Sequence, residues 1–275
     1  MPSRWSDLDR PPLDVRALKR ALVEGGLWRD IRVVDETGST NADVAGLARS
    51  GEPEGLVLIA EHQTAGRGRL GREWTAPARS GLAFSMLLRP VGVPAKSWTL
   101  LPLLVGVGAA SAVSRVADLE VTLKWPNDLM IGDCKLGGIL AERVDAPSGP
   151  AVVVGVGLNV SLHEAELPVA TAVSLGLADA ATTDRDTVVR ATLRGIAAEY
   201  GAWLDARGDG EQSVLPAYRA LCRTLGRDVR VELPGDRVVE GRAADIDADG
   251  SLLLDGPAGQ VVVTAGDVVH LRSDD

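Results

Sequence analysis

Apolar positions along the chain alternate between runs of strand length and longer segments with helical periodicity. A short amphipathic helix around Leu18 and Leu22 ends at Gly25-Gly26. The expected strands after it cover residues 31–35, 56–60, 82–88, 121–125, 128–131, 135–143 and 151–157. The expected helices cover residues 41–49, 98–116, 184–204 and 213–223. This mixture predicts an α+β domain.

Two of these helices follow hydroxyl residues that favour the first position of a helix. Ser39 and Thr40 precede the helix that begins at Asn41, and Ser97 precedes the long apolar helix. A hydroxyl oxygen there can accept a hydrogen bond from a backbone N–H that the first turn leaves unpaired. We therefore expect these residues to cap the two helices.

The pattern changes at Leu225. Five short strand candidates follow, at residues 229–233, 237–245, 251–255, 260–264 and 268–271, and turns rich in Gly, Pro and Asp separate them. This pattern predicts a small all-β barrel. We expect a first domain over residues 1–223 and a second over residues 224–275.

Composition narrows the classes of protein that the sequence can encode. The 275 residues are 45% hydrophobic, enough for a sizeable core, and the formal charge of −9 argues against coating nucleic acid or an anionic membrane. Cys134 and Cys222 are too few for a disulfide framework. The polar segment Met1–Pro12 carries no signal region, and the apolar run of residues 98–113 is short for a bilayer span. These features favour a soluble cytoplasmic protein.

The segment from Gln63 to Arg72 carries the clearest chemical signal. It places three glycines and three arginines directly after a buried strand. Glycine lets backbone N–H groups approach an anion, and the guanidinium groups of Arg67, Arg69 and Arg72 can grip phosphate or carboxylate oxygens. A solvated turn or a strand-binding RGG segment has the same composition. The segment lacks the G-x-x-x-x-G-K-[ST] pattern of a P-loop.

Two further segments add charged and open positions. Lys124-Trp125-Pro126-Asn127-Asp128 leads through a hairpin into Lys135-Leu136-Gly137-Gly138-Ile139-Leu140. Strand alternation puts Lys135, Gly137 and Ile139 on one face, so we expect the lysine to project over a surface left bare at Gly137. An ordinary edge-strand lysine remains the alternative.

The remaining segments suit a small polar ligand. Gly155-Val156-Gly157-Leu158-Asn159 ends an apolar strand, and its glycines permit close approach of a planar group. It does not match G-x-G-x-x-G, so a dinucleotide fold is unsupported. The hydroxyls and amide of Ser39-Thr40-Asn41 can serve a ligand as well as a helix start.

In this order and spacing, the motifs closely resemble those of the bacterial biotin protein ligases. The resemblance covers roughly residues 30–223, and the C-terminal strands resemble the SH3-like domain of that family. It implies a mixed-sheet catalytic domain of the kind shared with class II aminoacyl-tRNA synthetases. Some members carry an N-terminal DNA-binding domain, for which this sequence has no room. The resemblance implies the monofunctional type.

The activity implied by the resemblance is ATP-dependent formation of biotinyl-5′-AMP, followed by transfer to a lysine of the biotin carboxyl carrier domain of an acyl-CoA carboxylase. ATP and Mg²⁺ are the implied cofactors, with the metal ligands left unassigned. The implied biotin site is Ser39, Thr40, Asn41, Gln63, Gly66, Arg67, Gly68, Arg69, Trp74, Lys135 and Gly138. The implied ATP site is Arg69, Arg72, Lys124, Asn127, Asp128 and Asn159, and the implied catalytic residues are Lys135, Arg69 and Arg67.

The physical chemistry of these residues fits that reaction. The ureido ring of biotin has one acceptor and two donors, which a Ser/Thr/Asn cluster with Gln63 can satisfy, while Trp74 and Ile139 offer apolar walls. Arginine and lysine would neutralise the two anions that must meet. Because the ligand motifs lie before Val160, we expect the C-terminal strands to serve transfer or nucleotide closure.

Three alternatives remain open from the sequence. A lipoate–protein ligase shares the chemistry, but lipoate has no ureido group for Ser39-Thr40-Asn41 to bind. A non-enzymatic biotinyl-adenylate sensor would need a DNA-binding domain. An RGG-type RNA-binding module would need stacking aromatics, and only Trp74 lies near the arginines.

Overall fold

The computed structural model describes residues 10–233, 235, 237–257 and 259–271. Its larger part is built on a seven-stranded sheet in the order β1-β2-β5-β9-β8-β7-β6. Strands β1 and β2 are parallel and the other neighbours are antiparallel, which makes the sheet mixed as expected. The strands are β1 (Asp30–Val34), β2 (Leu56–Ala60), β5 (Gly81–Leu88), β6 (Val121–Lys124), β7 (Asp128–Ile131), β8 (Cys134–Val144) and β9 (Ala151–Asn159).

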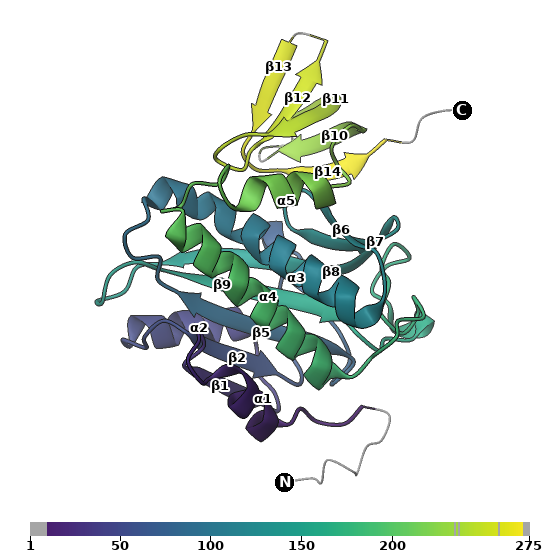
Figure 1. Cartoon of the computed structure of the whole chain (residues 1–275). Helices are drawn as coiled ribbons and strands as arrows, with labels where there is room; N and C mark the ends of the chain where they lie inside the picture. The colour runs from purple at the N-terminus through teal and green to yellow at the C-terminus, as the bar shows by residue number, and fades with distance from the viewer. Residues whose placement is uncertain (1–9, 234, 236, 258, 272–275) are drawn as a thin grey trace.

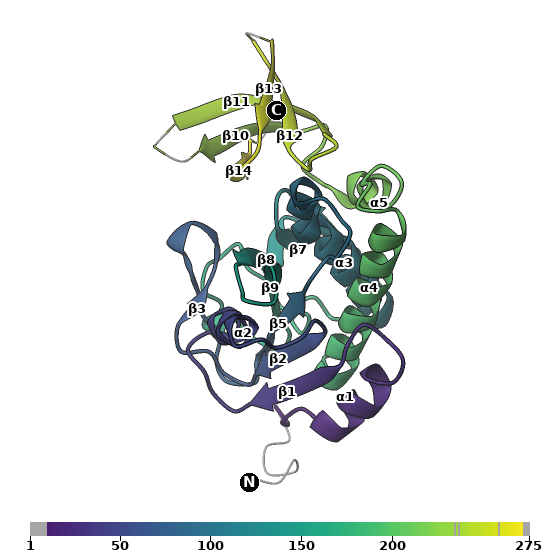
Figure 2. The same cartoon turned by 90° about the vertical axis from the view of Figure 1, so that its left-hand side faces the viewer.

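Helices cover both faces of this sheet (Figures 1 and 2). One apolar cluster joins the sheet to four helices, α1 (Val15–Leu22), α3 (Leu101–Ala117), α4 (Arg185–Asp205) and α5 (Val214–Leu221). A second, smaller cluster joins the other face to α2 (Thr40–Arg49). Burial of these two faces excludes water from most of the sheet, since β2 and β9 are buried along their whole length.

The central helix α3 differs from the sequence expectation at its start. It begins at Leu101, after the 3₁₀ helix η2 (Ala95–Leu100), and Ser97 makes no capping bond. Pro102 explains the boundary, because proline in the first turn gives up an N–H that has no helical partner there. Gly108 remains helical because it packs against the backbone of α4 at Gly195, where a side chain would not fit.

The segment Ala95–Ala117 is long and apolar enough to cross a membrane by length and composition, with a mean hydropathy of 1.7. However, 72% of that window is buried inside the structure. It packs against α4, α5 (Val214–Leu221) and the sheet, which accounts for its apolar composition as that of a core helix.

The five C-terminal strands form one antiparallel sheet in the order β13-β12-β11-β10-β14 (Figure 1). Their bounds are β10 (Asp228–Leu233), β11 (Arg237–Ile246), β12 (Leu252–Gly256), β13 (Gly259–Val263) and β14 (Asp267–His270). Trp125 ties this sheet to the larger one, because its indole N–H donates to the Gly250 carbonyl at 3.0 Å and its backbone N–H donates to Thr224 Oγ1 at 3.0 Å. The C-terminal sheet is therefore anchored beside β6 and β7.

Candidate active site

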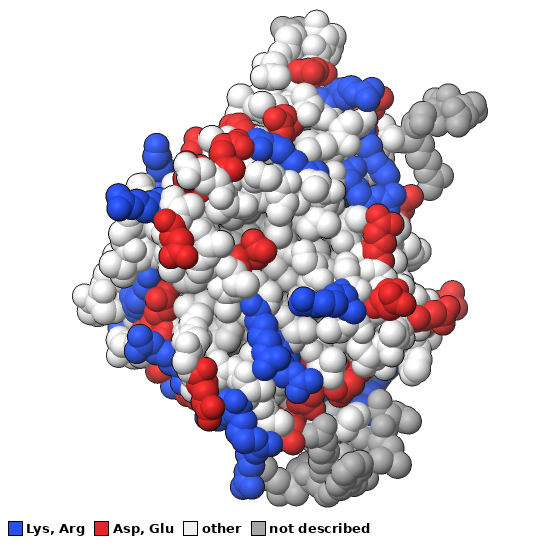
Figure 3. Space-filling model, in the orientation of Figure 1, with Lys and Arg blue, Asp and Glu red and all other residues white. Residues whose placement is uncertain are grey.

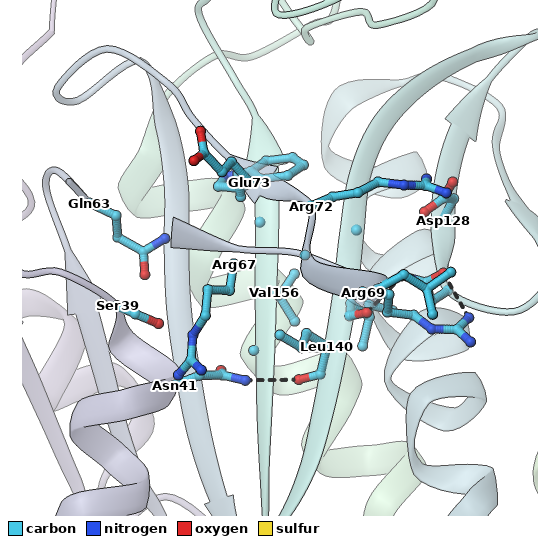
Figure 4. Close-up of a pocket in the computed structure, with 18 of the residues that line it drawn as sticks. Ser39, Asn41, Gln63, Arg67, Arg69, Arg72, Glu73, Asp128, Leu140 and Val156 are labelled. Carbon is cyan, nitrogen blue, oxygen red and sulfur yellow. Dashed lines mark hydrogen bonds between the residues drawn. The ribbon is translucent and has the colours of Figure 1, made fainter. Parts of the chain in front are cut away.

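A pocket opens where α2, β7, β8 and β9 meet the segment between β2 and β5 (Figure 4). It holds about 820 Å³ of space, part of it open to solvent. Residues Gly266 and Asp267 of the C-terminal sheet also line it. Most residues predicted from the sequence meet here: Ser39, Thr40, Asn41, Gln63, Arg67, Gly68, Arg69, Arg72, Trp74, Asn127, Asp128, Lys135, Gly138 and Ile139.

The start of α2 forms the polar end of the pocket. Gln63 Oε1 accepts hydrogen bonds from the Thr40 backbone N–H at 2.8 Å and from the Thr40 hydroxyl at 3.1 Å. The expected side-chain cap is absent, since the Ser39 hydroxyl makes no capping bond and Gln63 supplies the acceptor instead. Ser39 Oγ and Gln63 Nε2 have no hydrogen-bond partner among the described residues. These groups are available to a ligand.

Asn41 is held in part by Ser85 and Glu142, which the sequence did not single out. Its Nδ2 donates to the Leu140 carbonyl at 3.2 Å and to Glu142 Oε2 at 2.7 Å. Its Oδ1 lies 2.6 Å from Ser85 Oγ, which is also 2.7 Å from Thr40 Oγ1. Asn41 thus fastens α2 to β5 and β8. One signal was present, because Ser85 interrupts an otherwise apolar strand.

The glycines of β9 admit protein side chains. A Cβ on Gly155 would overlap the Asn41 amide, and a Cβ on Gly157 would come within 2.5 Å of the Trp74 indole. The sequence predicted that these glycines permit close approach of a planar ligand. In the structure the Trp74 ring occupies that position at Gly157, so the ring becomes a wall of the pocket.

The Gly/Arg segment folds as a small hairpin over the pocket. Strand β3 (Gly66–Arg67) pairs with β4 (Glu73–Trp74), and the 3₁₀ turn η1 (Arg69–Gly71) joins them. Gly66 pairs with Trp74 so closely that a Cβ would overlap the Trp74 carbonyl. Arg67 extends from this hairpin toward Asn41 (Figure 4) and forms no ion pair within the described part of the chain.

Arg69 is the most enclosed arginine of the hairpin. Its guanidinium donates to Asn127 Oδ1 at 3.3 Å, and Asn127 Nδ2 donates to the Ile139 carbonyl at 2.8 Å. Burial lowers the pKa of Arg69, against the opposing effect of the Asp128 carboxylate. An arginine remains charged after such a shift, so burial leaves a poorly hydrated cation suited to an anion.

Lys135 lies opposite a different glycine from the one expected. A β-bulge between β7 and β8 pairs Met130 with Lys135 and Leu129 with Gly137, which leaves Leu136 as an extra residue. The bulge interrupts the strict alternation assumed from the sequence. Gly138 therefore faces the lysine, and Gly137 packs against Gly157 and Leu158. Lys135 Nζ forms an ion pair with Asp128 Oδ1 at 2.6 Å.

Three predicted residues lie outside the pocket lining. Gly66 is buried in the hairpin pairing. Asn159 is 3% exposed and donates from Nδ2 to the Val173 carbonyl at 3.0 Å. Lys124 ends β6 beside His270. Burial and the charge of Lys124 lower the pKa of His270 to about 4. Lys124 and Asn159 therefore do not line the pocket, whereas Asn127, Asp128, Arg69 and Arg72 do, and the assignment of these six residues to ATP stays a prediction.

Comparisons with known proteins agree with this architecture. Residues 33–159 match the Biotin/lipoate A/B protein ligase family, and residues 224–271 match the biotin protein ligase C-terminal domain. The chain is 46% identical to the biotin–[acetyl-CoA-carboxylase] ligase of Mycobacterium tuberculosis, over 96% of this chain and 97% of the relative. It is 31% identical to the bifunctional ligase/repressor BirA of Escherichia coli, over 95% and 80%.

A solved structure has the same fold. The biotin protein ligase of Aquifex aeolicus in complex with biotin and ATP superposes with a TM-score of 0.73 and 25% identity, covering 90% of this chain and all of that one. The fold and site place the chain among the biotin and lipoate protein ligases. Within that class, the chain belongs to the biotin protein ligase family.

Proposed function

We propose that the protein is a biotin–protein ligase, which activates biotin with ATP and transfers it to a lysine of a biotin carboxyl carrier domain. The observation that carries the proposal is that neutral polar groups and cationic groups lie in separate parts of one pocket. Uncommitted hydroxyl and amide groups of Ser39 and Gln63 lie at one end, and the cations of Arg67, Arg69 and Lys135 line the rest.

The polar end suits the ureido ring of biotin. The Ser39 hydroxyl can donate or accept, and Gln63 Nε2 can donate to the ureido carbonyl. Trp74 and Ile139 supply apolar walls for the thioether ring and the aliphatic chain. A buried polar group left without its partner costs about 1–3 kcal/mol, so these groups favour biotin over lipoate, which has no ureido group.

The cationic groups suit adenylate formation. A biotin carboxylate oxygen attacks the α-phosphorus of ATP, and the bond from that phosphorus to the bridging oxygen breaks to release pyrophosphate. The reacting groups are both anionic, so Arg67, Arg69 and Lys135 lower the barrier by neutralising them and the charge of the transition state. The Arg69–Asn127 hydrogen bond fixes one of these donors before ATP arrives.

Transfer uses the same pocket. The neutral amine of the acceptor lysine attacks the biotinyl carbonyl, AMP leaves with the bonding electron pair of the C–O bond, and the nitrogen loses a proton to give the amide. The Lys135–Asp128 ion pair keeps one cation beside the departing phosphate. The acceptor of this proposal is the carrier domain of an acyl-CoA carboxylase, supported by the name of the M. tuberculosis relative.

Magnesium enters this proposal bound to ATP. The described residues contain no group of three or more His, Cys, Asp or Glu side chains that could hold a metal ion. Mg²⁺ prefers substrate phosphates, waters and one or two carboxylates to an all-protein cage. The pocket fits that mode, because the Asp128 carboxylate lines it beside Lys135, and the metal would supply further charge neutralisation.

The remaining parts of the proposal concern the whole chain. We assign catalysis to residues 1–223 and a C-terminal domain to residues 224–275, with support from the second sheet that starts at Asp228. We place the protein in the cytoplasm, where ATP and carboxylases are available. We propose no nucleic-acid or membrane role, and Figure 3 shows basic and acidic side chains interspersed on the visible face.

One experiment tests the function directly. The protein is incubated with MgATP and labelled biotin or lipoate, with and without a purified carrier domain. We expect a biotinyl adenylate in the absence of carrier and labelled carrier in its presence. Labelling with lipoate in place of biotin would favour the lipoate alternative. Adenylate without transfer, together with DNA binding, would favour the sensor.

A further inference from the structure

Asp267 brings a carboxylate of the C-terminal sheet to the pocket of the larger domain. It is the first residue of β14, and with Gly266 it lines the same pocket as Lys135 and Gln63. Its carboxylate forms a hydrogen-bonded ion pair with Arg72 of the hairpin, 195 positions away in the sequence. No motif in the sequence pointed to Asp267.

A carboxylate at this position needs a counter-charge if the pocket receives a triphosphate. Two like charges a few ångströms apart repel each other, and the repulsion is strongest where water is partly excluded. Arg72 removes that repulsion by pairing with Asp267, and the pairing raises the pKa of the Arg72 guanidinium. The pair is thus compatible with a nearby anion where a lone Asp267 would oppose one.

The pair also leaves donors free. Arginine has five N–H donors, and the hydrogen bond to Asp267 uses only the Nη2 group of Arg72. The Arg72 side chain is 57% exposed, so its other donors remain accessible. Asp267 therefore fixes where the guanidinium lies without consuming its capacity to bind phosphate oxygens.

The location of the pair places those donors on the rim. Leu70, Arg72 and Asp267 line the pocket and also line a neighbouring groove against β10 and β11, which holds about 750 Å³ of space, part of it open to solvent. The pair thus forms the partition between the reaction pocket and the outer groove. A phosphate tail that extends from the pocket toward this rim would meet Arg72 there.

We propose that Asp267 is a positioning residue for ATP, which holds Arg72 at the rim so that its remaining donors meet the phosphates of the nucleotide. The proposal rests on the proposed function for the identity of the nucleotide. It assigns the C-terminal sheet a specific contribution to the reaction pocket through one side chain. Asp267 itself touches no reacting atom.

The test measures MgATP binding by calorimetry without biotin, and then biotin-dependent ATP–pyrophosphate exchange. For Asp267→Asn we expect an about two- to fivefold weaker ATP affinity and a similar rise in KM for ATP, because an exposed charge pair is worth about 0.2–1 kcal/mol. The KM for biotin and the melting temperature should stay unchanged. Asp267→Glu, which keeps the charge, should recover part of the affinity.

The matched control is Glu240→Gln, which removes an exposed carboxylate of the same sheet outside the pocket lining. Glu240→Gln should change neither the ATP affinity nor the KM for ATP. In an Arg72→Ala background, Asp267→Asn should cause no further loss of ATP affinity and should instead relieve the repulsion between the unpaired carboxylate and ATP, since Asp267 favours ATP only through Arg72. Additive losses, unchanged ATP binding or tighter ATP binding by Asp267→Asn would each overturn the proposal.

The two readouts separate this proposal from the function. If the unchanged chain bound MgATP but catalysed no biotin-dependent exchange, the ligase function would fail, and the binding comparison would still decide the role of Asp267. If Asp267→Asn did not fold, Asp267→Glu would carry the same comparison. An ATP affinity of Asp267→Glu equal to that of the unchanged chain would then count against positioning.

Discussion

Lys135 Nζ lies 2.6 Å from Asp128 Oδ1 across the β7–β8 hairpin, with Gly138 beside both side chains. The bulge at Leu136 creates this relationship, because it turns Lys135 toward the pocket face that carries Gly138. The lysine is therefore already oriented in the free protein.

Replacing Lys135 by alanine should reduce adenylate formation by about 10²–10³-fold, because one positioned donor to a developing negative charge is lost. The measurement is biotin-dependent ATP–pyrophosphate exchange. The matched control is Lys19→Ala, since Lys19 also pairs with an aspartate, Asp30 at 2.8 Å, far from the pocket. Near-normal exchange by a folded Lys135→Ala protein would refute the catalytic assignment.

The hairpin of residues 66–74 should become protected when ligands bind. Three glycines raise the entropy cost of ordering it, and Arg67 has no ion-pair partner in the described structure until an anion arrives. Trypsin should cut in the free protein at Arg67, which is exposed and forms no ion pair among the described residues, and biotin with MgATP should strongly slow this cleavage. Cleavage at the exposed Arg207 serves as the internal control. Equal hairpin cleavage with and without ligands would contradict the prediction.

A Gly155→Ala substitution should weaken biotin binding at least about tenfold, because its Cβ would displace Asn41 and loosen the start of α2. Calorimetric titration with biotin measures the effect. Gly46→Ala is the control on the same helix, where a Cβ meets nothing within 4 Å. It should leave binding unchanged and stabilise the fold by about 0.5–1 kcal/mol. Unaltered biotin affinity in Gly155→Ala would exclude a positioning role for Asn41.

Acid should destabilise the contact between the two sheets through His270. Burial, followed by the charges of Lys124 and Arg227, lowers the pKa of His270 from 6.5 to about 4. The unfolded chain therefore binds this proton more readily, so the stabilisation is complete above about pH 6.5 and is lost as the pH falls toward 4. Melting temperatures over this range should fall less steeply in His270→Gln than in the unchanged chain.

The exposed His163 provides the comparison for that experiment. A His163→Gln variant should keep the slope of the unchanged chain. Identical slopes for the unchanged chain and both variants would show that His270 does not couple protonation to folding.

The sequence by itself determined the local structure and the chemical types of most site residues. Helical and strand periodicities depend on neighbours a few positions away, so they predicted the order of elements and the five C-terminal strands. The Gly/Arg segment and the two lysine motifs likewise predicted an anion site, because their glycines and cations lie close together in the sequence.

Only the tertiary structure decided which groups share the pocket. Sheet order brings β5, β9 and β8 side by side, and this places Ser85 and Glu142 on Asn41. Docking of the C-terminal sheet brings Asp267 to Arg72. The bulge at Leu136 makes Gly138, and not Gly137, the glycine that faces Lys135. Such contacts join positions up to 195 residues apart, so their geometry is set by packing of the whole fold, which no local pattern encodes.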